Sequence, residues 1–186
     1  MSERVINLPL TDEVIKELHA GDRVLLSGVI YTGRDEAHEF LCEMLEKGEE
    51  LPVDLKGQVI YYVGPCPAKP GEVIGSCGPT TSTRMDKYAP TIIREMGLKG
   101  MIGKGKRSQA VVDAIVENTC VYFAAIGGAG AMISDSVKEA EVVAFHEIGP
   151  EAIYRLRVEK YPCTVINDCY GRDLYNEGVE KYRKDK

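Results

Sequence analysis

Short runs of β-branched and aromatic residues alternate along the chain with segments whose apolar residues recur every three or four positions. Residues 23–30 (RVLLSGVI) and 58–63 (QVIYYV) are apolar runs of strand length, and this composition is typical of buried strands. Within residues 35–47 the apolar positions fall on one face of a helix, and Gly48 follows as a C-terminal cap. The pattern therefore predicts strands and helices in alternation.

This alternation of strands and helices extends along most of the chain. Helices are expected at residues 14–20, 86–96, 108–118 and 127–137, and strands at 101–102, 121–126, 141–145, 155–159 and 164–167. A brief helical turn starts at Pro150, and residues 177–186 are expected to form a frayed tail. This alternation predicts a single α/β domain over residues 1–186, with parallel or mixed strand pairing.

One long segment interrupts the regular pattern. Residues 64–81 (GPCPAKPGEVIGSCGPTT) contain four glycines and four prolines, which prevent a regular helix. Loops of this length inside a compact domain often carry binding or catalytic residues. We therefore expect this loop to be functional.

Composition and charge exclude several classes of protein. The 186 residues are 44% hydrophobic and 28% charged, which is typical of a globular domain. The net charge of −6 lacks the basic bias of a nucleic-acid binder. We find neither a signal-like N-terminus nor an apolar run of membrane-spanning length. We expect a cytoplasmic protein without nucleic-acid or membrane partners, in which any anion is bound locally.

The cysteines do not form a metal or disulfide motif. There is no Cys-x-x-Cys pair, and the three histidines are isolated from one another. We expect buried or loop thiols in a reducing compartment, with no metal ligands in this chain. The six residues are Cys42, Cys66, Cys77, Cys120, Cys163 and Cys169, and the roles of Cys66 and Cys77 stay open.

Three glycine-containing junctions between a strand or turn and a helix carry cations. A helix N-terminus has unpaired N–H groups and partial positive charge, so cations placed there cost stability unless an anion binds. Three such junctions in one domain predict an anion site. They are YTGRD with Arg34, GPTTSTRMD with Thr80, Thr81 and Arg84, and IGKGKRSQ with Lys104, Lys106 and Arg107.

Each junction also has a structural interpretation. An arginine after glycine can be a solvated surface residue, and Thr80 and Thr81 can cap the following helix. His38, one helical turn beyond Arg34, can pack or cap instead of contacting a ligand. However, adjacent hydroxyls within four residues of Arg84 also suit proton transfer, because a cation and nearby N–H groups stabilise an alkoxide.

Nucleotide-binding motifs are incomplete in this chain. Lys104 is followed by Gly105, whereas a phosphate-binding loop of the GxxxxGK[ST] type needs Ser or Thr at that position. The segment IGGAGA lacks the full GxGxxG pattern and the acidic residue after the next strand. The sequence therefore disfavours nucleotide binding.

Together these segments resemble the β-subunit, or C-terminal domain, of class I (iron–sulfur) fumarate hydratase and the related tartrate dehydratase. The similarity covers roughly residues 20–176 in the family's order. GPTTSTRMD followed by IGKG, with YTGRDEAH upstream, is a specific combination. The other matching segments are VYFAAIGGAGAMIS, VVAFHEIGPEAIYRLRV and TVINDCYGRDLY.

The resemblance implies a swivelling β/β/α domain, with a mixed or closed sheet flanked by helices. It implies a partner α-subunit that holds a [4Fe–4S] cluster on three cysteines, with one iron open as a Lewis acid. The expected assembly is a higher hetero-oligomer, and this chain alone should be inactive. The implied reaction is the reversible, stereospecific addition of water to fumarate, a C4 dicarboxylate, to give L-malate.

The resemblance also implies roles for five residues. Thr80, the first threonine of GPTT, would be the base that removes the proton beside a carboxylate, and Lys104 would add a cation at the reacting end. Arg34, Thr81 and Arg84 would contact substrate carboxylates. Arginine suits this role because its planar fork binds a carboxylate through two parallel hydrogen bonds.

Two alternatives stay open. Tartrate dehydratase, which converts L-tartrate to oxaloacetate, shares most of these motifs, although KGKRSQ favours the fumarase branch. The second alternative is a non-catalytic anion-binding or assembly module that uses the same loops.

Overall fold

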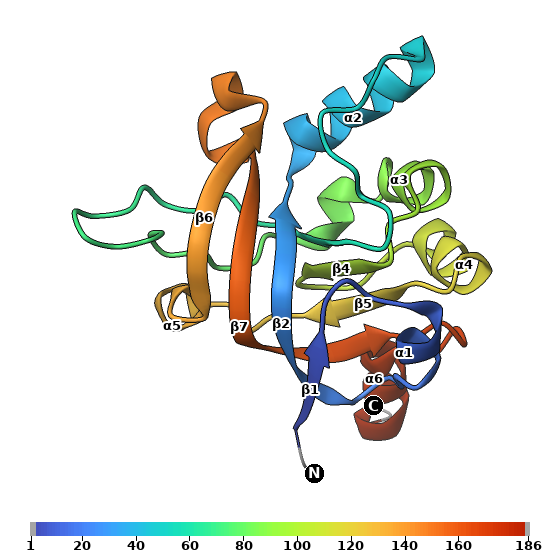
Figure 1. The fold of residues 1–186 in the computed structure, drawn as a ribbon. Coiled ribbons are helices and arrows are strands. Elements are labelled where there is room, and N and C mark those ends of the chain that lie inside the picture. Colours follow the sequence, from blue (N-terminus) through green and yellow to red (C-terminus); the bar gives the residue numbers. More distant parts are fainter. Residues whose placement is uncertain (1–2, 185–186) are drawn as a thin grey trace.

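The protein folds around one mixed β-sheet. The structure, a computed structural model, describes residues 3–184 and places seven strands in the order β1-β2-β3-β4-β5-β7-β6 (Figure 1). Strands β1 to β5 pair in succession and are parallel to one another, whereas β7 is antiparallel to β2, β5 and β6. The strands are β1 Arg4–Asn7, β2 Arg23–Thr32, β3 Val59–Tyr61, β4 Gly100–Gly103, β5 Val121–Ala124, β6 Val137–Ala144 and β7 Ile153–Asn167.

Strand β7 closes the sheet into a barrel. It pairs with β5 and also with β2, so β2, β3, β4, β5 and β7 form a ring, to which β1 and β6 are added at the sides. The β2–β7 register shifts between Leu26 and Gly28, and Gly28 has φ of 133°. Only glycine adopts this backbone conformation readily, so Gly28 allows β2 to bend at the irregularity.

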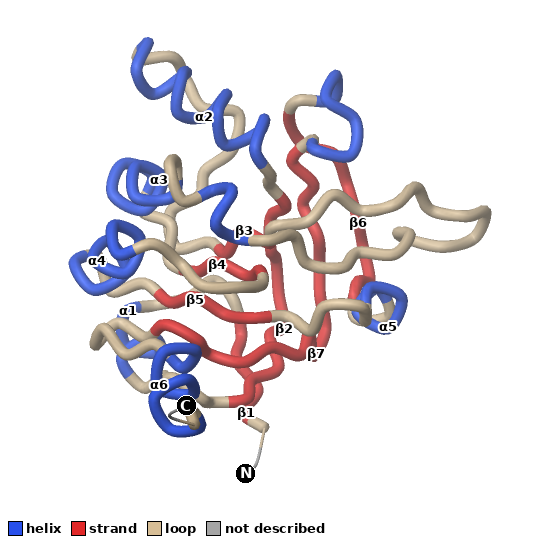
Figure 2. The backbone as a smooth tube through the Cα atoms, turned by 180° about the vertical axis from the view of Figure 1, so that it is seen from behind, coloured by secondary structure: helices blue, strands red, loops and turns tan. Residues whose placement is uncertain are grey.

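Helices cover the barrel. In both backbone views α2, α3 and α4 lie along one side of the sheet, whereas α1 and α6 lie near the chain termini and α5 lies beside β6 (Figures 1 and 2). The α-helices are α1 Asp12–Lys16, α2 Asp35–Lys47, α3 Ala89–Met96, α4 Gln109–Glu117, α5 Gly130–Ser134 and α6 Leu174–Tyr182. Two 3₁₀-helices are η1 Ser82–Met85 and η2 His146–Glu151.

The helix ends are defined by local sequence. Thr11 accepts a hydrogen bond from Val14 N at the start of α1, and Asp173 accepts two from the first turn of α6. Gly48 and Gly97 end α2 and α3 with φ of 66° and 64°, the left-handed conformation that terminates helices.

Two apolar clusters lie on opposite faces of the strands. Successive strand side chains point to opposite faces, so Val59 and Tyr61 join the cluster enclosed by the barrel, whereas Ile60 and Tyr62 join the cluster beneath the helices. The second cluster includes Ile92 and other apolar residues of α3 and α4. This packing holds β3 and β4 in place, so the segments that follow these two strands start from fixed positions.

The predicted α/β class, with a closed mixed sheet flanked by helices, is confirmed. Several boundaries differ. The strands predicted at 155–159 and 164–167 belong to one long strand, β7, which continues through Lys160 with φ of 52°. The helix expected over 127–137 covers only Gly130–Ser134, and strand β6, expected at 141–145, begins at Val137, because its pairing with β7 starts there.

Three further differences concern the ends of elements. Strand β1 was not predicted, and the helix expected over 86–96 starts only at Ala89, after the separate turn η1. Within residues 177–186, expected to form a frayed tail, α6 extends to Tyr182; residues 185–186 lie outside the described part. In the part of the chain that the structure describes, no helix is long and apolar enough to span a membrane.

Candidate active site

The predicted site residues follow parallel strands at one edge of the barrel. Arg34 follows β2, the long loop with Thr80 follows β3, and Lys104 follows β4. Backbone hydrogen bonds join these exits, from Gly33 N to Tyr61 O (3.1 Å) and from Thr80 N to Tyr62 O (2.7 Å). The carboxyl ends of parallel strands are where α/β proteins commonly bind ligands. The fold thus gathers the three predicted junctions at one edge.

The long loop returns to this edge at Thr80. It projects past β6 before it comes back (Figure 1), and its last residues run beside the segment after β4. Thr81 and Lys104 form an isolated parallel β-bridge, and Ser82 N donates to Lys104 O at 2.9 Å. The backbones of the two predicted catalytic segments are therefore in direct contact.

Arg84 lies in η1 and binds the start of α2. Its Nε donates to Asp35 Oδ1 at 3.0 Å, and its Nη2 lies 2.9 Å from Asp35 Oδ2 in an ion pair. One of the five guanidinium N–H groups, that of Nε, is used in this hydrogen bond, and the side chain is 52% exposed. Arg84 therefore keeps accessible donors while Asp35 fixes its orientation.

Arg34 is the N-cap residue of α2 and pairs with a second carboxylate. Its Nη2 lies 3.2 Å from Glu151 Oε1, and the other Glu151 oxygen accepts from Glu36 N at 3.2 Å. Arg34 Nε is buried and has no hydrogen-bond acceptor among residues 3–184. Charges thus alternate from Arg84 through Asp35 and Arg34 to Glu151, which leaves unpaired donors on both arginines.

The threonines and Lys104 are open to solvent. Thr81, Arg84 and Lys104 are exposed, and Thr80 is half-buried. Neither Thr80 nor Thr81 caps a helix, because α3 begins at Ala89 and η1 has no side-chain cap bond. The capping alternative for these two hydroxyls is therefore wrong.

Arg107 is not part of this open edge. Its side chain is fully buried, its Nε donates to Asp86 Oδ1 at 2.7 Å, and its guanidinium lies 5.2 Å and 5.0 Å from the ring centres of Tyr62 and Tyr122. Asp86 also accepts from Ser108 N at 2.6 Å. The prediction that Arg107 adds a cation to an anion site is wrong, because its guanidinium is buried beside Asp86, Tyr62 and Tyr122.

His38 is a packing residue beneath the edge. It is 1% exposed, its ring meets Tyr62 edge-on, and its Nδ1 lies 2.7 Å from Arg34 O. A carbonyl only accepts, so Nδ1 carries the proton and donates. Burial lowers the pKa of His38 from 6.5 to about 4, so the ring stays neutral near pH 7. Of the alternatives for His38, packing is the one observed.

Several residues of the edge were missed by the sequence reasoning. Asp35 and Glu151 hold the two arginines, and Ser82 and Tyr122 connect the loops, with their oxygens 2.9 Å apart. Asp35 stands inside the recognised motif YTGRD, so its position was a usable signal. Glu151 and Tyr122 gave none, since they reach the edge only through packing.

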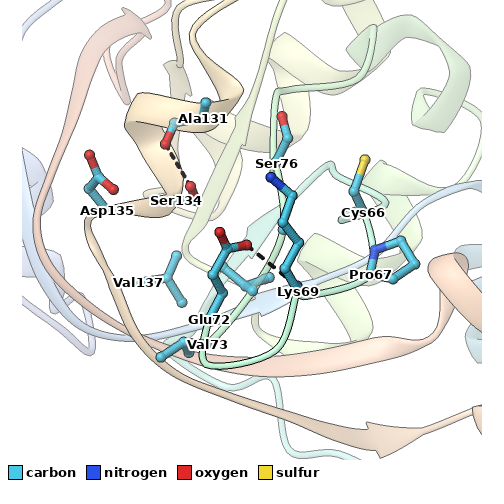
Figure 3. A pocket seen from close by; sticks show the side chains of 12 residues that line it. Cys66, Pro67, Lys69, Glu72, Val73, Ser76, Ala131, Ser134, Asp135 and Val137 are labelled. Atoms are coloured by element: carbon cyan, nitrogen blue, oxygen red, sulfur yellow. Dashed lines mark hydrogen bonds between the residues drawn. The ribbon is translucent and has the colours of Figure 1, made fainter.

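A cavity of about 520 Å³ lies away from these residues. It is formed between the long loop and α5, and Lys69, Glu72, Ser76, Ser134 and Asp135 are among its lining side chains (Figure 3). No residue predicted for the anion site lines it. The candidate active site is therefore the open strand edge and not this cavity.

The cysteines do not assemble into a site. Within residues 3–184, no group of three or more His, Cys, Asp or Glu side chains is placed to hold a metal ion. All six thiols are free; Cys66 is exposed, and Cys77, Cys120 and Cys163 are buried. Burial raises the pKa of Cys77 to about 11 and that of Cys120 to about 12, which disfavours the thiolate form that binds metals.

Comparison with known proteins identifies the family. Residues 2–178 match the family model described as "Fumarase C-terminus". The chain is 39% identical to the putative class I fumarate hydratase of Geobacillus stearothermophilus (98% of this chain, 36% of that protein) and 38% identical to the anaerobic class I fumarate hydratase of Escherichia coli (95% and 33%). It spans about a third of the length of these relatives.

A third relative has nearly the same length as this chain. The putative L(+)-tartrate dehydratase subunit beta of Methanocaldococcus jannaschii is 39% identical over 92% of this chain and 91% of that protein. The family match covers the strand edge with all five predicted site residues. The chain therefore belongs to the fumarase C-terminus family.

Proposed function

We propose that this chain is the substrate-binding and proton-transferring part of a hydro-lyase that reversibly hydrates fumarate to L-malate. The observation that carries the proposal is the β-bridge between Thr81 and Lys104, beside the Arg84–Asp35 ion pair. This arrangement brings hydroxyls and cations from three segments of the chain to one strand edge. The names of the relatives support the reaction class.

In the proposed reaction, Arg34, Thr81 and Arg84 bind the carboxylates of the C4 dicarboxylate. Arg84 keeps N–H groups that are not hydrogen-bonded to Asp35, so it can donate to a substrate carboxylate without releasing that partner. The buried Nε of Arg34 gives a second donor. Because Asp35 and Glu151 already orient the two guanidinium groups, less side-chain entropy is lost when substrate binds.

Thr80 is the proposed base. It removes the proton from the carbon beside a carboxylate in the direction of dehydration and returns it on hydration. A threonine hydroxyl is a very weak acid, so its alkoxide requires a nearby positive charge. Lys104, the partner of Thr81 in the β-bridge, is the proposed source of that charge. Donors fixed in advance toward developing negative charge contribute about 3–4 kcal/mol each in comparable sites.

The resemblance implies a [4Fe–4S] cluster, and the residues of this chain do not fit one. The thiols are dispersed, and the part of the chain that the structure describes offers no cluster of metal ligands. We propose that a partner α-subunit, or an equivalent domain, carries the cluster and covers the open edge. A partner is also consistent with the relative named as a "subunit beta" and with the two longer relatives. We further propose that the complex is a cytoplasmic hetero-oligomer.

L-tartrate is the second candidate substrate. The relative of matching length is named for L(+)-tartrate dehydratase, and its 39% identity equals that of the fumarate hydratase relative. The five proposed site residues suit either hydroxydicarboxylate, because both present two carboxylates and a hydroxyl beside an acidic carbon. The substrate is therefore a question for direct assay.

The test is anaerobic co-expression of this chain with its α partner, followed by assays with fumarate, L-malate and L-tartrate. Turnover of fumarate and L-malate at a higher kcat/KM than L-tartrate supports the proposal. A preference for L-tartrate assigns the second candidate. Dicarboxylate binding without turnover of any of the three compounds would contradict the hydro-lyase proposal and favour the anion-binding module.

A further inference from the structure

Ser82 lies between the two segments that carry the proposed catalytic residues. It immediately follows Thr80 and Thr81 and is fully buried. Its backbone N donates to Lys104 O at 2.9 Å, and Lys104 N donates back to Ser82 Oγ at 3.1 Å. Ser82 thus holds both polar groups of the Lys104 peptide backbone.

The Ser82 hydroxyl belongs to a chain of buried hydrogen bonds. Ser82 Oγ lies 2.9 Å from the hydroxyl of Tyr122, which donates to Gly105 O at 2.9 Å. The Tyr122 proton is used on Gly105 O, so the Ser82 hydroxyl donates to Tyr122 and accepts from Lys104 N. Each of these protons takes part in one hydrogen bond. The hydrogen bonds connect Lys104 and Gly105 to strand β5, which carries Tyr122, and hold the two residues in place.

Ser82 is closely packed. A β-carbon added at Gly103 would lie 2.0 Å from Ser82 Oγ and 2.9 Å from the Tyr62 ring, so only glycine fits at position 103. The buried guanidinium of Arg107 lies 5.0 Å from the centre of the Tyr122 ring. Close neighbours therefore surround both members of the hydroxyl pair.

We infer that Ser82 and Tyr122 are positioning residues, which set the distance between the Thr80–Thr81 segment and Lys104 without contacting substrate. The inference rests on the proposed function. Both side chains are buried, and both hydroxyl protons are used in hydrogen bonds within the protein, so neither hydroxyl has a proton left to donate to a ligand. Their effect on the reaction passes through Lys104 and the loop that it pairs with.

Removing either hydroxyl should lower the rate more than the affinity. Ser82→Ala leaves Lys104 N without its acceptor, and Tyr122→Phe leaves Gly105 O without its donor. Small misplacements of catalytic groups can cost up to about 100-fold in rate. For each variant in the reconstituted complex we expect kcat to fall about 10- to 100-fold and KM to change less than about threefold, because Arg34 and Arg84 are held independently by Glu151 and Asp35.

A double-mutant cycle separates positioning from mere stabilisation. If Ser82 acts through Lys104, then kcat of the double variant Ser82→Ala/Lys104→Ala should be less than about twofold below kcat of Lys104→Ala alone. The matched control is Ser136→Ala, which likewise removes a buried serine hydroxyl. Ser136 directly precedes β6, and its hydroxyl donates to Ile133 O at 2.6 Å. We expect the control to lower the melting temperature and leave kcat per folded complex unchanged.

Amide hydrogen exchange of the full chain gives a readout independent of activity. We expect the Lys104 amide to exchange at least about tenfold faster in Ser82→Ala than in wild type. The positioning inference is overturned if the Lys104 amide exchanges at the wild-type rate in Ser82→Ala, or if the kcat losses of Ser82→Ala and Lys104→Ala multiply in the double variant. In either case an active wild-type complex still supports the proposed function. A wild-type complex inactive on the whole substrate panel instead overturns the proposed function, and with it any catalytic effect of Ser82.

Discussion

Replacing Asp86 by asparagine tests whether Arg107 is a buried structural cation. The Arg107 side chain is completely buried, and its Nε lies 2.7 Å from Asp86 Oδ1, whose side chain is 11% exposed. Asp86→Asn keeps the size of the side chain and removes its charge. We expect the guanidinium then to stay buried beside the rings of Tyr62 and Tyr122 without a counter-charge.

The expected cost follows from this burial. Removing one partner of a buried ion pair typically costs about 3–5 kcal/mol, because the other charge is left uncompensated. Asp86→Asn also weakens the bond from Ser108 N that begins α4. We therefore expect the free energy of unfolding to fall by about 3–5 kcal/mol, a large part of the 5–15 kcal/mol that is typical of a domain.

Urea unfolding of the full chain, followed by circular dichroism, measures this loss. With an m-value of about 2 kcal/mol/M the midpoint should fall by about 2 M. The control is Asp113→Asn on α4, an exposed carboxylate that accepts from Gln109, for which we expect less than about 1 kcal/mol. If Asp86→Asn costs no more than this control, the guanidinium is hydrated, and Arg107 would again be a candidate anion contact.

Two further predictions concern His38 and Arg84. Burial lowers the pKa of His38 to about 4, so the stability gained from its neutral ring is complete above about pH 6.5 and is lost, by about 3 kcal/mol, as the pH falls to about 4. Urea midpoints of wild type and His38→Gln across this range test it, and parallel profiles would contradict it. Arg84→Lys should change the free energy of unfolding by less than about 1 kcal/mol, because the pair with Asp35 is exposed. It should nevertheless lower kcat/KM at least tenfold, because lysine cannot bind a substrate carboxylate through two parallel hydrogen bonds. Unchanged kcat/KM in the reconstituted complex would exclude Arg84 as a carboxylate contact.

The sequence predicted the elements whose pattern is local. Helix α2 was found with its correct bounds because its apolar face and Gly48 are adjacent in sequence. Strand β1 was missed because only Ile6 of its four residues is buried, which leaves no periodicity to detect. The continuity of β7 depends on pairing with β2, β5 and β6, and neighbouring residues do not reveal such pairing.

The candidate site shows the same division. The cations and hydroxyls after β2, β3 and β4 were identified from their motifs, and closure of the barrel brings them to one edge. The residues that hold them come from distant segments of the sequence. Glu151 pairs with Arg34 although the two lie far apart in the sequence, and Tyr122 lies 40 positions from its partner Ser82. Arg107 was misjudged for the same reason, because the basic turn GKGKR gives no sign of the aspartate and tyrosines that enclose its last residue.

The most direct test of the central claim is the rate of fumarate hydration by the complex that contains Thr80→Ala. Thr83→Ala is the matched control, since Thr83 is an exposed threonine of the same segment whose hydroxyl has no proposed role. Thr80→Ala should lower kcat at least about 100-fold with KM changed less than about threefold, whereas Thr83→Ala should leave both within about twofold. Wild-type kcat in Thr80→Ala would contradict the assignment of this edge as the proton-transfer site.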